Sequence, residues 1–210
     1  MPTTAKICGL TTAATLDAAV AGGASHVGFV FFPASPRDIA PDEAASLASR
    51  LPSQVQAVGV FVDPDDQQIA RAAPFLRMIQ LHKTAPARAA AIRARFDREI
   101  WAAIPVRTRA DLGAAASYQG AADRILFDAK PPEGAALPGG LGLRFDWRLL
   151  DGFRHPLPWA LSGGLDPDNV GEAIGITGAR LVDVSSGVES APGVKDVDKI
   201  GRFLQSTARS

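Results

Sequence analysis

The sequence predicts an α/β protein whose strands close into an eight-stranded (βα)8 barrel, on the strength of two observations. Short apolar runs rich in Val, Ile and Phe alternate with Ala-rich segments of helical periodicity, which indicates βαβ units and a parallel sheet. The apolar runs are hydrophobic almost without interruption, which indicates strands buried on both faces. Eight such repeats in 210 residues predict a compact barrel, smaller than the usual ~250 residues but within the range of the fold.

Each repeat supplies one expected strand and one expected helix. The strands are predicted at residues 5–8, 26–31, 56–62, 78–82, 99–106, 124–128, 158–162 and 181–185. The helices are predicted at residues 12–21, 41–51, 69–75, 87–96, 110–118, 146–151, 167–174 and 197–204. In the first helix Ala13, Leu16 and Val20 fall on one apolar face. The sixth helix has the weakest pattern of the eight.

A doubly wound open sheet is the main alternative to the barrel. Such a sheet usually carries a Gly-rich nucleotide loop after its first strand. The segment Cys8-Gly9-Leu10-Thr11-Thr12 stands at that place and does not have this composition. We find no linker or shift in composition along the chain, so residues 1–210 are expected to form one catalytic domain.

The composition argues against several classes of partner. The charge is balanced, with 22 Lys and Arg against 22 Asp and Glu, so nothing indicates nucleic acid or an anionic membrane. No apolar run approaches the ~20 residues that span a bilayer. His26, His82 and His155 are widely separated and share no metal-ligand spacing, so no bound metal is expected.

The single cysteine indicates a cellular compartment. Cys8 has no partner with which to form an internal disulfide. The chain also shows no cationic stretch followed by the apolar run of a signal peptide. Together these features predict a protein of the reducing cytoplasm.

Glycines follow the last two expected strands, where catalytic sites of such barrels are built. The two ends read Ser162-Gly163-Gly164 and Ser185-Ser186-Gly187. Glycine lets backbone N–H groups approach an anion closely, and a helix start adds partial positive charge. A single segment of this kind could equally be a turn that only reverses the direction of the chain. Two on neighbouring strands favour phosphate, so we predict a TIM barrel of the phosphate-binding type.

Cys8 ends the first expected strand, which neighbours the eighth in a closed barrel, so the thiol should lie beside the predicted phosphate site. Lys6 shares its face of the strand, and Asp183 is the candidate partner that a buried lysine needs. A nearby ammonium group favours the thiolate, and a cysteine can abstract a proton. A buried, space-filling cysteine is the alternative, and these residues alone leave both interpretations open.

Asp128 ends the sixth expected strand, nearly opposite Cys8 across the mouth of the barrel. A carboxylate there is rarely a packing residue, although a helix or loop cap is the alternative. The arrangement places an acid and a base on opposite sides of a phosphorylated substrate. The connection that follows, residues 129–145, is rich in Pro and Gly and too long for a plain loop. We predict a mobile lid there rather than a disordered surface segment.

Arg37 lies in the loop after the second strand. A guanidinium group can hold a carboxylate bidentately, which favours a role in substrate binding. A surface ion pair with Asp38 is the alternative. Gln80 and His82 share one face at the end of the fourth strand and are expected to line the pocket without a catalytic role.

The chain resembles the phosphoribosylanthranilate isomerases over nearly its whole length. The most specific motifs are Lys6-Ile7-Cys8-Gly9-Leu10-Thr11 and Val182-Asp183-Val184-Ser185-Ser186-Gly187-Val188-Glu189, the latter followed by Pro192-Gly193 and Lys195-Asp196. Further matches are Gly28-Phe29-Val30-Phe31, Ser35-Pro36-Arg37, Val58-Gly59-Val60-Phe61-Val62, Ile79-Gln80-Leu81-His82, Asp128-Ala129, Phe145-Asp146-Trp147 and Leu161-Ser162-Gly163-Gly164-Leu165.

The resemblance implies a cofactor-free aldose–ketose isomerase of tryptophan biosynthesis. Such an enzyme converts N-(5-phosphoribosyl)anthranilate to 1-(2-carboxyphenylamino)-1-deoxyribulose 5-phosphate by an Amadori rearrangement. This phosphorylated aminosugar is the expected partner, without nucleic acid or membrane, and the chain is expected to be a monomer or homodimer.

The resemblance also implies roles for particular residues. Cys8 matches the general base, Asp128 the general acid, and Arg37 the residue that holds the anthranilate carboxylate. The backbone at Gly163-Gly164 and at Ser185-Ser186 matches the phosphate site. Asp183 and Gly187, beside that site, are the remaining candidates for substrate binding.

Two other functions are alternatives to this one. One is another phosphosugar barrel, such as the histidine-pathway aldose–ketose isomerase or its dual-substrate relative. Those enzymes hold a second phosphate on a Gly-rich end after strand three, where this chain has Phe61-Val62-Asp63-Pro64. Those enzymes also use Asp where this chain has Cys8. A non-catalytic protein that binds a phosphometabolite is the alternative of another class, and the presence of Cys8, Asp128 and Arg37 argues against it.

The chain departs from the family pattern at two places. Lys83 follows Leu81-His82 where a glycine is usual, and Leu141 and Leu143 stand where Ser or Thr is more usual. Since neither departure touches the acid, the base or Arg37, altered affinity is the largest effect expected.

Overall fold

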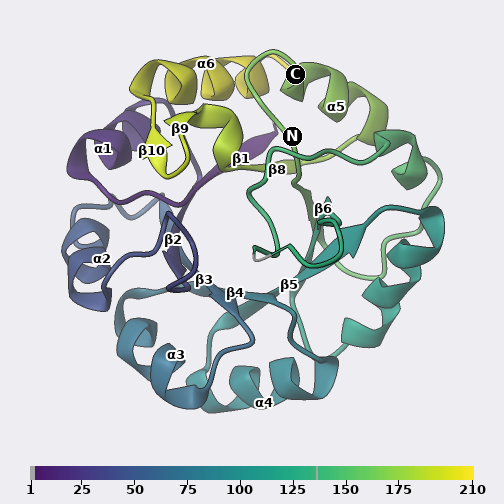
Figure 1. Cartoon of the computed structure of the whole chain (residues 1–210), viewed down its shortest axis with the longest axis horizontal. Coiled ribbons are helices and arrows are strands. Elements are labelled where there is room, and N and C mark those ends of the chain that lie inside the picture. The colour runs from purple at the N-terminus through teal and green to yellow at the C-terminus, as the bar shows by residue number, and fades with distance from the viewer. Residues whose placement is uncertain (1–2, 136) are drawn as a thin grey trace.

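In the computed structural model, which describes residues 3–135 and 137–210, eight parallel strands close into a barrel in the order β1 to β8 (Figure 1). Parallel pairing of β1 with β8 closes the ring, so the predicted (βα)8 barrel is confirmed. The strands are β1 (Thr4–Cys8), β2 (His26–Phe31), β3 (Gln56–Val62), β4 (Met78–His82), β5 (Glu99–Val106), β6 (Arg124–Ala129), β7 (Trp159–Leu161) and β8 (Leu181–Val184).

Helices surround this barrel on its outside (Figure 1). The α-helices are α1 (Ala13–Ala21), α2 (Pro41–Ala48), α3 (Asp66–Ala72), α4 (Pro86–Phe96), α5 (Val170–Thr177) and α6 (Val197–Ala208). The 3₁₀ helices are η1 (Ala73–Phe75), η2 (Arg109–Tyr118), η3 (Trp147–Leu150) and η4 (Ser186–Val188). A two-stranded hairpin of β9 (Glu189–Ala191) and β10 (Val194–Lys195) completes the chain's elements.

Several helices differ from the prediction, and for one of them local side-chain bonds explain the difference. The helix expected at 167–174 begins later, at Val170, because the Asp166 carboxylate accepts the N–H groups of Asp168 and Asn169 and holds the backbone in a turn. The segment expected as a helix at 110–118 is the 3₁₀ helix η2. The weak sixth helix is only the short η3, which seats Trp147 in the core.

The inside of the barrel has two halves of different chemistry. Near the amino ends of the strands it is filled by a buried apolar cluster, comprising Val58, Met78, Trp101, Ala103, Leu126, Ala160 and Leu181. Near the carboxyl ends the buried side chains are polar or charged, among them Lys6, Gln80, His82, Asp128, Ser162 and Asp183. A larger apolar core lies between the strands and the surrounding helices.

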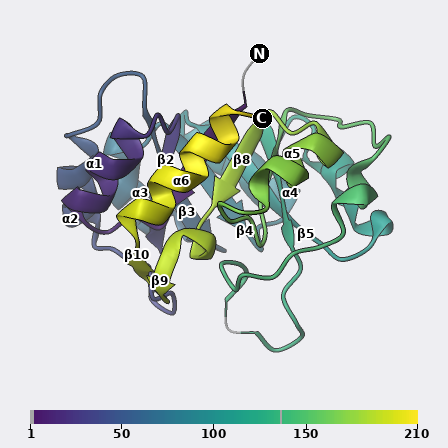
Figure 2. The same ribbon diagram turned by 90° about the horizontal axis from the view of Figure 1, so that it is seen from above.

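Two segments project from the carboxyl end of the barrel. Figure 2 shows the connection between β6 and η3 and the β9–β10 hairpin extending from this same end. Both stand over the polar half of the interior, so they are placed to shape whatever binds there. Within the described residues, no helix is both long enough and apolar enough to cross a membrane.

Candidate active site

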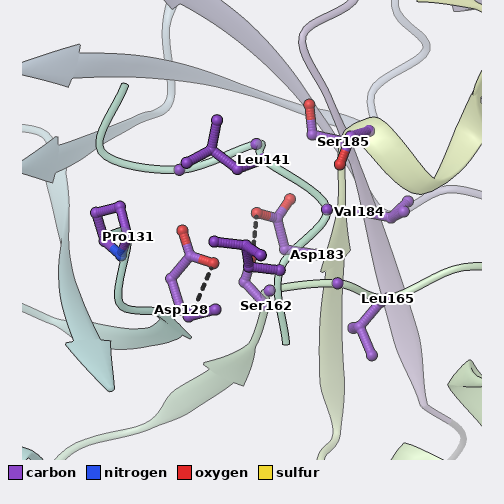
Figure 3. A pocket seen from close by; sticks show the side chains of 16 residues that line it. Asp128, Pro131, Leu141, Ser162, Leu165, Asp183, Val184 and Ser185 are labelled. Carbon is purple, nitrogen blue, oxygen red and sulfur yellow. Dashed lines mark hydrogen bonds between the residues drawn. The ribbon is translucent and has the colours of Figure 1, made fainter. Parts of the chain in front are cut away.

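A cavity of about 70 Å³ opens at the carboxyl ends of the strands. Its lining includes five predicted site residues, Cys8, Arg37, Asp128, Asp183 and Ser185. A second pocket shares Asp128, Asp183 and Ser185 with it and continues between β7, β8 and the β6–η3 connection (Figure 3). Gly163, Gly164 and Ser186 line this second pocket, so predicted residues from separate strand ends meet around one continuous space. The exception is Gly187, which lines a neighbouring pocket together with Gly164 and Ser186.

Lys6 and Asp183 form the ion pair that the sequence predicted. Lys6 Nζ lies 2.8 Å from Asp183 Oδ1, and the lysine side chain is fully buried. Asp183 Oδ2 also accepts a hydrogen bond of 3.3 Å from Ser162 Oγ. Burial alone would lower the pKa of Lys6, but the charges of Asp183 and of ionised Cys8 outweigh it and raise that pKa above its ordinary value. Lys6 is therefore a permanent positive charge under the cavity.

Cys8 lies against this pair in a narrow space. A Cβ at Gly28, its neighbour on β2, would come within 2.9 Å of Cys8 Sγ, so only glycine leaves room for the sulfur there. Burial raises the pKa of the Cys8 thiol, and the opposing charge of Lys6 does not cancel that effect. The expectation that the lysine would favour the thiolate is thus right in direction, but in the free protein burial outweighs it and Cys8 is a thiol at neutral pH.

Asp128 is held on the other side of the cavity. Its Oδ1 accepts the N–H of Ala129 at 2.8 Å, and its carboxylate points into the same pocket as that of Asp183 (Figure 3). Burial, reinforced by the negative charge of Asp183, raises the pKa of Asp128 to about 7. Asp128 is therefore a carboxyl group that can give up a proton near neutral pH.

The predicted phosphate segments follow β7 and β8 on one side of the second pocket. Gly163 and Gly164 have φ of +88° and +65°, and a Cβ on Gly163 would meet Ala129 N at 2.5 Å, so this turn requires glycine. Gly187 lies so close to Leu165 that a Cβ would come within 1.9 Å of the Leu165 carbonyl oxygen. Among the described residues, we find no hydrogen-bond acceptor for the backbone N–H of Gly164 or Ser186. These donors can receive an anion.

Arg37 is buried rather than exposed, and its partner is not Asp38. The Asp38 carboxylate instead accepts the N–H of Phe32 at 2.7 Å. Arg37 Nε and Nη2 donate to Glu189 Oε1 and Oε2 at 2.7 and 2.8 Å, and Nη2 also donates to the Gly140 carbonyl at 3.0 Å. The guanidinium group therefore holds a carboxylate bidentately already, and only the side that carries Nη1 remains for a ligand.

Gln80 and His82 line the cavity as expected. Gln80 Nε2 lies 2.9 Å from His82 Nε2, and both side chains are buried. Burial, aided by the charge of Lys6, lowers the pKa of His82 to about 4, so the imidazole is neutral at pH 7. A neutral ring beside an amide can orient a substrate by hydrogen bonds, and the lack of a catalytic role stays a prediction.

The β6–η3 connection covers Asp128, the candidate acid, and Arg37, the candidate carboxylate-binding residue. A Cβ on Gly139 would lie 2.6 Å from Asp128 Oδ2, and one on Gly140 would lie 2.6 Å from Arg37 Nη1. The connection therefore reaches the acid and the guanidinium group directly, as the lid interpretation requires; its mobility stays a prediction. Leu141 and Leu143, the departures from the family pattern, are each 42% exposed on it.

The sequence reasoning assigned no role to Glu189 and Lys195, which the structure places beside Arg37. Both are buried, although neighbouring residues of the same short hairpin, Ser190, Ala191 and Val194, are exposed. The signal that could have found them is that both are charged residues within the family motifs, in which the charged Asp183 had been assigned a role. The other departure, Lys83, has φ of +53°, the left-handed conformation that explains why glycine is usual there. No cluster of His, Cys, Asp or Glu suited to a metal ion occurs among residues 3–135 and 137–210.

Comparisons with known proteins agree on one family. The family model described as N-(5'-phosphoribosyl)anthranilate (PRA) isomerase matches residues 5–206. An N-(5'-phosphoribosyl)anthranilate isomerase of Zymomonas mobilis subsp. pomaceae is 53% identical over 204 residues, covering 96% of each chain. Another, of Paramagnetospirillum magneticum, is 50% identical over 209 residues, 98% of this chain and 97% of the relative.

Solved structures point the same way. Phosphoribosyl anthranilate isomerase from Thermotoga maritima superposes with a TM-score of 0.85 and 36% identity, over 99% of this chain and 100% of that one. A second structure, 34% identical with a TM-score of 0.83, is of the isomerase in complex with reduced 1-(o-carboxyphenylamino)-1-deoxyribulose 5-phosphate, with the same coverage. A third is of monomers generated from the dimeric Thermotoga maritima enzyme, at 36% identity and a TM-score of 0.82, again with that coverage.

Proposed function

This chain belongs to the N-(5'-phosphoribosyl)anthranilate isomerase family, and from that premise we propose which of its residues carry out the reaction. The family's activity is an isomerisation in tryptophan biosynthesis, the conversion of N-(5'-phosphoribosyl)anthranilate to 1-(2-carboxyphenylamino)-1-deoxyribulose 5-phosphate. In our proposal Asp128 is the general acid and Cys8 the general base. The observation that carries it is that both, though far apart in the sequence, line one cavity beside the phosphate-type turns.

The first proposed step is opening of the sugar ring. Asp128 gives its proton to the ring oxygen as the bond from that oxygen to C1' breaks. The lone pair of the anilino nitrogen forms a double bond to C1', which leaves a cationic imine and an Asp128 carboxylate. A pKa of about 7 suits this role, because an acid works best when its pKa lies near the working pH.

In the second proposed step Cys8 acts as a thiolate. It takes the proton from C2', and the freed electron pair forms a C1'–C2' double bond while the imine nitrogen regains its lone pair. The resulting enolamine tautomerises to the ketone, so no oxidant or reductant is consumed. Cys8 enters this step already ionised, with its proton released to solvent before the substrate binds. The positive charges of Lys6 and of the cationic imine favour that thiolate.

Two further sites would hold the ends of the substrate. The turns at Gly163-Gly164 and Ser185-Ser186-Gly187 would bind the phosphate through backbone N–H groups. Arg37 would bind the anthranilate carboxylate through the side that carries Nη1, since Glu189 occupies Nε and Nη2. Asp183 would act by keeping Lys6 charged beside Cys8. This arrangement needs no bound cofactor.

Localisation and assembly remain our proposals as well. A free, catalytic thiol is best kept in a reducing compartment, which supports the cytoplasm. A monomer or a homodimer is expected, in keeping with the relative described as dimeric. The only partner proposed is the small phosphorylated substrate, with neither nucleic acid nor membrane.

The experiment uses freshly made substrate, whose fluorescence is lost as it isomerises. Wild-type protein should abolish the signal, whereas Cys8→Ala and Asp128→Asn should each lower kcat by at least about 10²–10⁴-fold. Both variants should still bind the reduced product analogue within about threefold of the wild-type Kd, because neither change removes a phosphate or carboxylate contact. Asp42→Asn, an exposed acid on α2, serves as the matched control and should behave as wild type.

Two results would overturn parts of this proposal. An unchanged signal with wild-type protein would contradict the isomerase activity. A variant at Cys8 or Asp128 that retains more than about a tenth of the wild-type kcat would remove that residue from the chemistry.

A further inference from the structure

Arg37 is held by a buried carboxylate that is itself held by a lysine. Glu189 Oε1 accepts from Arg37 Nε at 2.7 Å and from Lys195 Nζ at 2.5 Å, and Glu189 Oε2 accepts from Arg37 Nη2 at 2.8 Å. The exposed fractions of the Arg37, Glu189 and Lys195 side chains are 6%, 4% and 1%. Three charged groups therefore meet almost out of contact with water.

The charges of this group do not balance. Burial alone would raise the pKa of Glu189, but the hydrogen bond from Arg37 and the charge of Lys195 outweigh it and hold the pKa below its usual value, so the carboxylate is ionised. One negative charge then faces two positive ones, and burial, which outweighs the charge of Glu189, lowers the pKa of Lys195. An uncompensated buried charge is costly, so the group as a whole favours the arrival of an anion on Arg37.

The β9–β10 hairpin is built so that it presents this pair to Arg37. Glu189 and Lys195 are directly opposed in the hairpin's antiparallel register. At its turn Gly193 has φ of +81°, and its N–H donates to Glu189 Oε2 at 3.2 Å. A Cβ on Gly193 would meet the Pro36 carbonyl oxygen at 2.4 Å, so the turn packs directly on the loop that carries Arg37.

The same lysine connects the group to the other side of the cavity. Lys195 Nζ donates to the carbonyl of Ser185 at 3.0 Å and lies 3.2 Å from Ser185 Oγ. Ser185 Oγ in turn donates to the carbonyl of Cys8 at 3.2 Å. A continuous set of hydrogen bonds therefore runs from Arg37 to the phosphate-type turn and to the backbone of the proposed base.

We propose that Glu189 and Lys195 are positioning residues for the substrate carboxylate: Glu189 fixes Arg37 so that Nη1 faces the cavity, and Lys195 fixes Glu189 against Ser185. The inference rests on the proposed role of Arg37 and deepens it. In this arrangement the ring carboxylate is recognised by a single preorganised side of the guanidinium group, at a set distance from the phosphate turn. Neither Glu189 nor Lys195 touches the substrate.

The test compares two ligands that differ in one group. One is reduced 1-(o-carboxyphenylamino)-1-deoxyribulose 5-phosphate, and the other is its counterpart with an unsubstituted phenyl ring. Wild-type protein should bind the first more tightly. In Glu189→Gln an amide N–H₂ faces Arg37, so the ratio of the two Kd values should fall about 10- to 100-fold, with KM for substrate rising by a similar factor and kcat changing far less. Lys195→Met should have the same effect to a smaller degree.

A double-mutant cycle separates positioning from general stability. If Glu189 acts through Arg37, then Arg37→Ala combined with Glu189→Gln should discriminate between the ligands no worse than Arg37→Ala alone. Glu43→Gln, an exposed acid on α2, is the matched control and should leave the ratio unchanged. Circular dichroism establishes whether each variant is folded. If Glu189→Gln does not fold, Lys195→Met tests the positioning role in its place.

The possible results distinguish the positioning role of Glu189 and Lys195 from the carboxylate-binding role of Arg37. If wild-type protein binds both ligands equally, Arg37 does not bind the carboxylate, and both the proposed function of Arg37 and this inference fail. If wild-type protein discriminates and the folded Glu189 and Lys195 variants discriminate equally well, only the positioning role fails. Weaker binding of both ligands by the same factor would likewise overturn it, since it marks a merely structural contribution.

Discussion

The two halves of the barrel interior, stacked along the same strands, follow opposite rules. On β6, Leu126 and Asp128 point to the same side because they are two residues apart, and both are buried. Leu126 belongs to an apolar cluster in which every neighbour favours burial. Asp128 belongs to a layer of charges whose burial must be compensated by Lys6, Ser162 and backbone groups. The apolar half stabilises the barrel. The charged half lowers the stability of the fold, and in return its reactive groups are held in defined protonation states.

The largest expected effect is a loss of stability on substitution in the apolar half. Leu126→Ala should lower the free energy of unfolding by about 2–5 kcal/mol, because it leaves a cavity in a fully buried cluster. Urea unfolding followed by circular dichroism measures the loss, and kcat should stay within about threefold of wild type below the transition. A stability loss under about 1 kcal/mol would contradict the distinction between the halves.

The second expected effect concerns the charged half and is a pH dependence of kcat/KM. The active form needs Asp128 protonated and Cys8 ionised, yet the pKa of Asp128 is about 7 and burial holds that of Cys8 above its ordinary value. Below pH 7 the thiolate fraction grows while Asp128 keeps its proton, so kcat/KM should rise about tenfold per pH unit. Above pH 7 the growth of thiolate is cancelled by loss of the Asp128 proton, so kcat/KM should level off.

Steady-state kinetics between pH 5 and 9, in buffers of constant ionic strength, test this profile. A clear fall of kcat/KM between pH 7 and 9 would place the higher of the two pKa values within that range and would contradict the raised pKa of Cys8. In that case the Lys6 ammonium, rather than burial, would determine the state of the thiol.

The smallest effect concerns the stability that the charged half gives up. The pKa of Asp128 is about 7 in the folded protein, against ~4 for an unfolded aspartate. Between these values the unfolded chain releases the proton first, so stability falls as the pH rises through this window. Asp128→Asn should therefore raise the free energy of unfolding by about 1–3 kcal/mol at pH 8 and change it little at pH 4.5. An equal change at both pH values would show that this carboxyl has an ordinary pKa.

The strands could be predicted from the sequence almost to the residue. The ranges 26–31, 56–62, 78–82 and 99–106 agree with β2 to β5 because a strand buried on both faces needs an unbroken apolar run. Helix ends were predicted less well, since side-chain bonds such as those of Asp166 decide them. The β9–β10 hairpin was missed because its strands are too short to carry a pattern.

The sequence by itself determined the barrel, the strand ends at which chemistry can occur, and the presence there of Cys8, Asp128 and the glycine turns. These follow from local patterns, which depend on residues close together in the chain. Only the tertiary structure decided the protonation states and the partners. Burial keeps Cys8 protonated at neutral pH and raises the pKa of Asp128 to about 7. Arg37 pairs with Glu189, which lies 152 residues away in the sequence. Desolvation and long-range pairing depend on what surrounds a group in space, and no local pattern carries that information.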